Sequence, residues 1–361
     1  MAKIKITCPN CERILQCGER DRGHKVKCPH CKERIAVPQM SIVREALTKV
    51  NRRGAGKKIR LIAGSAAVTL VLAVLAVWLF QPVIIRWPDR RPVGMLFLAS
   101  NFHASPMNPR GWFNDPGLNV TGAGGQERFH KALLDYADRS IAILKRTGAQ
   151  GAIVWDVEGE QYPHKTTFIG DPRWLDRLAP EMAAVADEFF ARLRQAGFKV
   201  GVTVRPQQLV FEKGQARQTQ VLNEQRTLLE KIDYARKRWG ATMFYVDSTG
   251  GIRRPDEVWQ LRGVARARPD ILLIPEHHYL PYWTFAAPYI PLREGDATRS
   301  GNLAQKFFRG TFAAVDVGDM AEDAEKIVAA RDRGDILLFR AWTWSPECQL
   351  LKSFAHAPPA R

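Results

Sequence analysis

The strongest constraint on this chain is an uninterrupted apolar run. Residues 61–80 read LIAGSAAVTLVLAVLAVWLF, 20 residues without a charged side chain, and QPVII extends the run to position 85. As a helix, 20 residues reach about 30 Å, the thickness of the hydrocarbon core of a bilayer. A buried core helix rarely lacks a polar face over this length, and a cleaved signal peptide would not follow a long segment with its own motif. We therefore expect a transmembrane helix at residues 61–85.

Cations flank this run unevenly. Six precede it and three follow it: Lys49, Arg52, Arg53, Lys57, Lys58 and Arg60, then Arg86, Arg90 and Arg91. By the positive-inside rule, the N-terminus lies in the cytoplasm and the body from residue 92 onward lies in the periplasm or outside the cell. Trp78 and Trp87 are expected at the outer membrane interface. Residues 1–60 hold 16 Lys and Arg against 5 Asp and Glu, so the net charge of +17 belongs mainly to this segment, and residues 41–60 form a basic juxtamembrane linker.

The N-terminal cysteines form two pairs with metal-ligand spacing. Cys8 and Cys11 are separated from Cys28 and Cys31 by sixteen residues, and each pair is a C-x₂-C knuckle. Four thiolates in this pattern bind Zn²⁺ tetrahedrally and close a small fold that lacks a core of its own. We predict a structural zinc ribbon over residues 1–40.

This segment resembles the finger-like zinc ribbons at the N-termini of many bacterial membrane proteins. The resemblance covers about residues 5–38 and does not define a partner, and we expect a structural role or docking of a cytoplasmic protein. The basic surroundings permit phosphate contacts, but no aromatic residue precedes Trp78 to stack on a base, so nucleic acid is not the expected partner.

The body of the chain alternates apolar strands with amphipathic helices. Strands are expected at 94–100, 152–157, 199–205, 242–247, 271–276, 312–316 and 336–340, with a sixth strand inside 286–310. Helices are expected near 127–146, 178–193, 222–239, 256–267 and 321–333. This alternation favours an α/β protein with a (β/α)₈ barrel over residues 92–361. An open doubly wound sheet would carry a G-x-G-x-x-G turn after its first strand, and none is present.

Charged residues gather where the predicted strands end. The acids are Asp156, Glu158, Glu160, Asp247, Glu276, Asp316 and Asp319, and Arg205 and Arg340 end two further strands. In a barrel these ends share the rim that hosts catalysis. Helix capping explains one or two such acids but not their repetition. Asp156, Glu158 and Glu160 are expected on one face, provided that the second strand stays extended.

Two carboxylates on successive strands fit glycoside cleavage. One protonates the leaving oxygen and the other attacks the sugar or activates water. Asp247 and Glu276 occupy these places, and neighbouring strands would hold their carboxylates close enough for a retaining mechanism. We expect the pocket walls to carry the acids near residue 156 and further polar and aromatic residues: Asp156, Glu158, Glu160, Arg205, Tyr245, His277, His278, Trp283, Arg340 and Trp342.

The strand ends GAIVWD, KVGVTVRPQ, FYVDS and IPEHHY resemble those of barrel glycoside hydrolases and hydrolase-like proteins over residues 94–345. The order Asp, Glu, Asp after the fourth, fifth and seventh strands is similar to the α-amylase clan. That similarity implies Asp247 as nucleophile, Glu276 as acid/base and Asp316 as stabiliser, although Tyr245 stands where that clan has an arginine.

Two other functions remain open from the sequence. One is a non-catalytic ectodomain that binds or senses carbohydrate and is linked through the membrane to the ribbon. The other is a metal-dependent hydrolase using Asp247, His277 and His278 with Asp156. Adjacent histidines on an extended strand point to opposite sides, which counts against the second alternative. For the glycosidase, no cofactor is expected in the barrel.

Overall fold

The computed structural model describes residues 3–11, 13–21, 23–37, 70–74, 85–100, 104–160, 169–212, 215–292, 297–317 and 324–340. The chain divides into two compact units, Met1–Ala76 and Val77–Arg361.

The first unit is built on two small antiparallel hairpins. Strand β1 (Lys3–Thr7) pairs with β2 (Ile14–Gly18), and β3 (Lys25–Lys27) pairs with β4 (Arg34–Ala36). A knuckle cysteine closes each turn, because the N–H groups of Cys8 and Cys28 donate to carbonyls five residues later, at 3.0 and 2.8 Å. The core consists of little more than cysteines and a few aliphatic side chains. A core this small does not stabilise a fold by itself and needs a structural metal ion or a disulfide.

The expected membrane helix falls mainly on residues 61–69 and 75–84, which lie outside the described residues. Residues 70–74 are helical, and Leu70 and Val74 are 67% and 61% exposed. In the described part of the chain, no helix has both the length and the apolar character needed to cross a membrane.

The second unit is an eight-stranded parallel sheet that curls into a barrel. Its strands are β5 (Val93–Phe97), β6 (Gly151–Trp155), β7 (Lys199–Val204), β10 (Met243–Val246), β11 (Leu272–Pro275), β12 (Tyr289–Pro291), β13 (Ala314–Asp316) and β14 (Ile336–Arg340). They pair in sequence order, with β14 returning to β5. Strands β11 and β12 are the two ends of the sheet, and the N–H of Ala287 donates to the carbonyl of Leu273 at 2.9 Å across that gap. The predicted (β/α)₈ architecture is confirmed.

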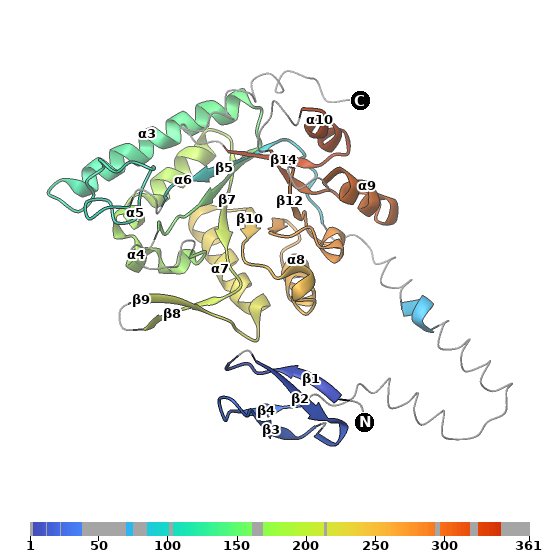
Figure 1. Ribbon diagram of the computed structural model, residues 1–361. Helices are drawn as coiled ribbons and strands as arrows, with labels where there is room; N and C mark the ends of the chain where they lie inside the picture. The colour runs from blue at the N-terminus through green and yellow to red at the C-terminus, as the bar shows by residue number, and fades with distance from the viewer. Residues whose placement is uncertain are drawn as a thin grey trace. The chain divides into compact units, whose positions relative to one another are not determined.

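Helices cover the outside of this sheet (Figure 1). They are α3 (Gly125–Arg146), α4 (Leu175–Leu178), α5 (Pro180–Ala183), α6 (Ala186–Gln195), α7 (Glu224–Trp239), α8 (Glu257–Ala267), α9 (Ala297–Phe307) and α10 (Ala324–Asp332). The single helix expected at 178–193 is broken into three pieces. Helix α9 and an antiparallel hairpin, β8 (Gln208–Glu212) with β9 (Gln215–Thr219), were not anticipated.

Alternation along the strands divides the core into two layers. Met243 and Tyr245 of β10 point into the barrel, whereas Phe244 and Val246 pack against the helices. Leu338 of β14 belongs to the same interior group. Because successive side chains of a strand point to opposite faces, the inward positions of all eight strands form one column that ends at the C-terminal rim.

The segment before β5 closes the other end of the barrel, which corrects the expected position of Trp87. This side chain is 6% exposed, and its Nε1 donates to Oε1 of Gln150 at 2.9 Å. Lys199 of β7 lies over its ring, with Nζ 4.7 Å from the ring centre, and also donates to Asp89 at 2.7 Å. Trp87 is therefore part of the barrel core rather than an interfacial anchor, and the barrel begins before residue 92.

Replacing Trp87 by alanine should lower the free energy of unfolding of the barrel by about 3 kcal/mol, because a large buried side chain is lost. Urea denaturation of the full chain in detergent, followed by circular dichroism, measures this change. Trp259, which is 59% exposed, is the matched control, and Trp259→Ala should change stability by less than about 0.5 kcal/mol. Equal effects of the two substitutions would contradict the assignment.

Candidate functional site

The four knuckle cysteines converge on one point. The Sγ atoms of Cys8 and Cys31 lie 3.5 Å apart, those of Cys11 and Cys28 lie 3.7 Å apart, and all four fall within 4.8 Å of one another. Four sulfurs placed about 2.3 Å from one ion at tetrahedral corners would be roughly 3.8 Å apart. The thiol spacing therefore fits a single tetrahedral metal ion.

Local backbone geometry supports thiolate ligands here. The N–H groups of Cys31 and then His30 point at the sulfur of Cys28 and lower the pKa of that thiol to about 6. Cys17 is also buried, but it lies outside the four-sulfur group, and the ring of His30 contacts Arg13 instead. The predicted ligand set is thus the one that the fold brings together.

The barrel gathers its predicted charged residues at the C-terminal rim. Val246 of β10 pairs with Pro275 of β11, so Asp247 and Glu276 are the next residues along two adjacent strands. Their N–H groups continue the sheet by donating to the carbonyls of Val204 and Val246, at 3.0 and 3.1 Å. Both continue the inward column that contains Tyr245.

Arg205, which follows β7, contacts Asp247 directly. Its Nε and Nη2 both reach the same carboxylate oxygen, Oδ2, while Nη1 donates to Gln218 at 2.9 Å. In the described part of the structure no hydrogen bond to Oδ1 of Asp247 is present. The strand-end arginine predicted for the pocket wall therefore lies beside this acid, and it comes from the neighbouring strand and not from position 245.

Glu276 is held in a similar one-sided way. The N–H of Ser248 donates to its Oε2 at 2.7 Å, and Ser248 adopts a φ of 60° to present that group. Burial and then the charge of Asp247 raise the pKa of Glu276. Glu276 borders an open pocket of about 640 Å³, within the size range of small-molecule sites, which is also lined by Thr249, Gly250, Gly251, Arg253, His277, His278, Tyr279, Leu280, Tyr289 and Pro291.

Asp316 and the tyrosines lie at the same level of the barrel. The hydroxyl of Tyr289 donates to Oδ2 of Asp316 at 2.7 Å. Tyr245 packs between Trp155 and Tyr289, with ring centres 4.6 and 5.4 Å away, and is 3% exposed. Tyr245 therefore forms the floor beneath the acids and does not offer an open ring face to a ligand.

The three acids after β6 do not share one face, which corrects that expectation. The strand ends at Trp155, and Asp156 has a φ of 57°, so the chain turns and the alternation is lost. Both carboxylate oxygens of Asp156 are buried without a hydrogen-bond partner among the described residues, and burial, then Glu160, raise its pKa well above the usual range. Burial also raises the pKa of Glu160 to about 7.

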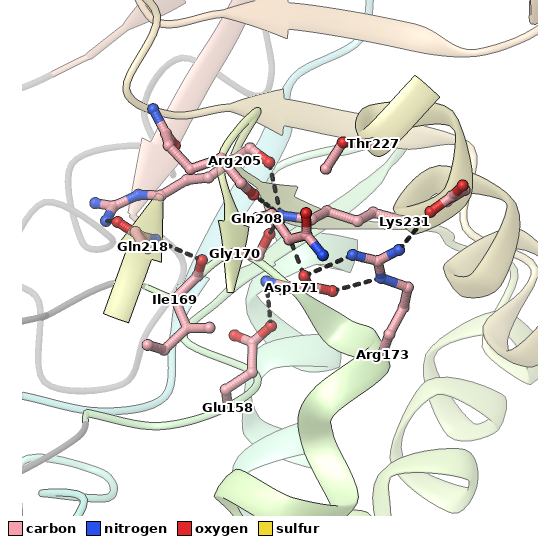
Figure 2. A network of polar contacts seen from close by, with 12 residues as sticks. Glu158, Ile169, Gly170, Asp171, Arg173, Arg205, Gln208, Gln218, Thr227 and Lys231 are labelled. Atoms are coloured by element: carbon pink, nitrogen blue, oxygen red, sulfur yellow. Dashed lines mark hydrogen bonds and ion pairs between the residues drawn. The ribbon is translucent and has the colours of Figure 1, made fainter. Parts of the chain in front are cut away.

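Glu158 belongs to a buried structural network instead (Figure 2). Its Oε1 accepts the N–H of Asp171 at 2.8 Å, and Arg173 forms a two-point contact with the Asp171 carboxylate at 2.8 and 2.9 Å. Lys231 is 1% exposed and donates to the carbonyls of residues 170, 205 and 207 at 3.2, 2.7 and 2.7 Å. Burial is the main reason that the pKa of Lys231 is lowered to about 8. This network fixes the backbone at Arg205.

Some of the remaining predicted residues lie at the pocket or the rim, and others do not. His277 and His278 line the pocket, and Arg340 ends β14 in the inward column. Trp283 is 1% exposed and packs in the outer core, so it is not a wall of the site. Trp342 and Asp319 lie outside the described residues. Among the described residues, only the four cysteines bring three or more candidate metal-ligand side chains together, so the metal-dependent alternative has no support there.

Sequence reasoning missed several residues that shape the site. Tyr289 lies in the strand that could not be located, and Gln218 lies on the unanticipated hairpin, where it connects Arg205 to the carbonyl of Ile169 at 2.8 Å. Arg253 and the two glycines before it line the pocket. A Gly-Gly pair soon after a strand-end acid was the one available signal, since it indicates a tight turn at the rim.

No protein-family model and no curated protein matches this sequence. Similar solved structures include a maltogenic α-amylase from Thermotoga neapolitana, 13% identical, with a TM-score of 0.46 over 74% of this chain and 76% of that chain. An α-fucosidase from Thermotoga maritima is 12% identical, with a TM-score of 0.42 over 77% and 75%. A homocysteine methyltransferase from Escherichia coli is 14% identical, with a TM-score of 0.41 over 74% and 97%. Likeness this low does not assign a chemistry to the chain.

The full chain should carry one zinc ion, and Cys28→Ser should abolish its retention, because three thiolates and a hydroxyl bind zinc far more weakly than four thiolates. Elemental analysis of freshly purified protein measures the ratio of zinc to chain. Cys17→Ser is the matched control and should keep the metal, since this buried cysteine lies outside the cluster. A wild-type protein without zinc would end the assignment.

Proposed function

We propose that this protein is a membrane-anchored glycoside hydrolase that acts on a poly- or oligosaccharide outside the cytoplasm. The observation that carries the proposal is that two neighbouring carboxylates are bound by different groups. Asp247 and Glu276 follow adjacent strands, and each has one oxygen fixed: Oδ2 by Arg205, and Oε2 by the N–H of Ser248. Glycoside cleavage needs such a pair, one group ionised and one protonated.

The two environments suggest which residue does what. The guanidinium of Arg205 binds Oδ2 of Asp247, which leaves Oδ1 to attack the anomeric carbon and form a glycosyl-enzyme ester. The raised pKa of Glu276 keeps a proton for the leaving oxygen as the glycosidic bond breaks. Glu276 then takes a proton from water, which attacks the same carbon and releases Asp247. This sequence retains the configuration of the sugar.

Other residues of the rim have supporting roles in this proposal. Asp316, held by the hydroxyl of Tyr289, supplies negative charge near the sugar ring, and Arg340 contributes a donor. Asp156 and Glu160, whose raised pKa values favour the neutral form, are hydrogen-bond donors for sugar hydroxyls, and Glu160 is the reserve acid. His277 and His278 contribute the far wall of the pocket.

Asp247→Asn and Glu276→Gln should each lower the rate of reducing-sugar release about 10²–10⁴-fold, because each removes one of the two groups that the reaction requires. Activity should also fall at high pH as Glu276 loses its proton. The full chain in detergent is the right material, because a fragment starting at residue 92 would lack the buried Trp87. Glu212→Gln, a change on the exposed hairpin strand, is the control and should retain full activity.

Full activity of both variants on a substrate that the wild type cleaves would refute the catalytic assignment. Binding of polysaccharide without cleavage by the wild type would favour the alternative function, a carbohydrate-binding or sensing ectodomain. In that case the pocket would bind carbohydrate, and Asp247 and Glu276 would have no catalytic role.

Membrane anchoring rests on the charge-free run and on the exposed apolar side chains at residues 70–74. In this proposal the zinc ribbon lies in the cytoplasm and the barrel lies outside the inner membrane. A reporter that is active only outside the cytoplasm should be active when fused after Arg91 and inactive when fused at Gln39. Neutralising the six cations before the run should weaken this preference. The reverse activity pattern would overturn the orientation.

A further inference from the structure

The pocket beside Glu276 has a different charge character from the rest of the rim. Among the described residues that line it are Arg253, His277 and His278, and Glu276 is the one carboxylate of that described lining. Asp247, Asp316 and the acids after β6 are not among these lining residues. Arg253 is exposed to the pocket, and within the described residues its guanidinium has no ion pair. A cation in this position is available to a ligand.

The cationic wall is built on a tightly constrained turn. Gly251 has a φ of 52°, and a Cβ there would lie 3.1 Å from Cβ of His277, so the imidazole packs directly against the turn backbone. Buried Glu257 accepts the N–H of Gly250 at 2.6 Å, and Ser248 donates to Glu276 from the other side. The turn that carries Arg253 is therefore anchored at both ends, and Arg253 lines the same pocket as His277 and Glu276.

The negative charge that could oppose an anion is reduced at this place. Asp247 is paired with Arg205, and burial raises the pKa of Glu276. Asp316, which is bound by the Tyr289 hydroxyl, is not among the residues that line the pocket. An anionic group in the pocket therefore meets Asp247 already paired with a guanidinium, and Arg253 offers the planar donor pair that suits carboxylates and sulfates.

We propose that the substrate is an acidic saccharide whose carboxylate or sulfate is bound by Arg253 and His277 in this pocket. The inference rests on the proposed function and adds a substrate class to it. The anionic group belongs to a sugar next to the glycosidic bond whose oxygen Glu276 protonates. The turn at residues 248–253 therefore both binds Glu276, through Ser248, and recognises the substrate, through Arg253. Neutral α-glucans lack the group that this wall would recognise.

Matched pairs of polysaccharides test the proposal. Each pair shares a backbone and differs only in the anion: polygalacturonate and its methyl ester, heparosan and its carboxyl-reduced form, and chondroitin sulfate and desulfated chondroitin. Binding is measured by calorimetry with the full chain in detergent, in the Glu276→Gln background to prevent cleavage. The acidic member of the polygalacturonate and heparosan pairs should bind at least about 10-fold more tightly if the wall binds a carboxylate. Both members of the chondroitin pair keep the glucuronate carboxylate, so a preference of about 10-fold within that pair would identify sulfate as the bound anion.

Arg253→Gln and His277→Gln should each remove that preference, because Arg253 supplies a charge-assisted bond to the anion and His277 supplies a second donor. Arg266→Gln, an equal charge change at an exposed position of α8, should leave it intact. This control matters because the basic N-terminal segment attracts any polyanion.

The outcomes separate the two proposals. Equal binding of neutral and acidic members would overturn the acidic-substrate inference and leave the glycosidase proposal standing. A preference that survives both pocket substitutions would place the anion elsewhere and would also overturn it. If the wild type neither binds nor cleaves any member of any pair, the acidic-substrate inference fails, whereas the proposed function fails only if neutral poly- and oligosaccharides are not cleaved either.

Discussion

Closure of a parallel sheet imposes the constraint on which the rest of this barrel depends: every second side chain of every strand must fit into one narrow interior. Below the rim this space is filled by apolar and aromatic groups, among which Tyr245 packs against Trp155 and Tyr289. One position further along each strand the inward side chains are mostly polar, and Asp247, for example, is still only 7% exposed. These side chains face one another, which is why strand-end residues far apart in sequence, such as Asp247 and Asp316, share one neighbourhood.

The fold then gives chemically similar acids different environments. Asp247 meets a guanidinium, Glu276 meets a backbone N–H, and Asp156 is buried with neither. Burial of a carboxylate without a partner favours the neutral acid, whereas an adjacent cation favours the anion. The side chains alone are three ordinary carboxylates. Their distinct protonation preferences come from which neighbours each strand end is given, and such differences are what acid/base chemistry uses.

Rigid support for this arrangement comes from polar groups that do not touch the pocket. Lys231 extends from α7 to three backbone carbonyls near Arg205, and Asp171 connects it to Arg173 and Glu158 (Figure 2). A buried ammonium is stable only when its three donors are satisfied, as they are here. The hairpin formed by β8 and β9 adds Gln218, which holds the other side of the Arg205 guanidinium. The geometry of the rim thus depends on residues whose contribution is hydrogen bonding to the backbone and to Arg205.

Sequence alone determined the features that depend on local spacing. Two C-x₂-C knuckles specify a tetrahedral sulfur group because three residues of chain limit where two thiols can lie. Alternating apolar strands and helices specify a (β/α)₈ barrel because parallel strands need crossover helices, and the seven strands that were located all appear near their expected ranges.

Tertiary structure decided everything that depends on contact between distant segments. It placed Trp87 in the barrel core, removed Trp283 from the site, turned the chain at Asp156 so that the alternation expected over three acids was lost, and paired Arg205 with Asp247 in particular. Periodicity predicts which face a side chain occupies while a strand lasts. It carries no information on where the strand stops or which long side chain reaches across, because these are set by packing and hydrogen bonding among residues tens of positions apart.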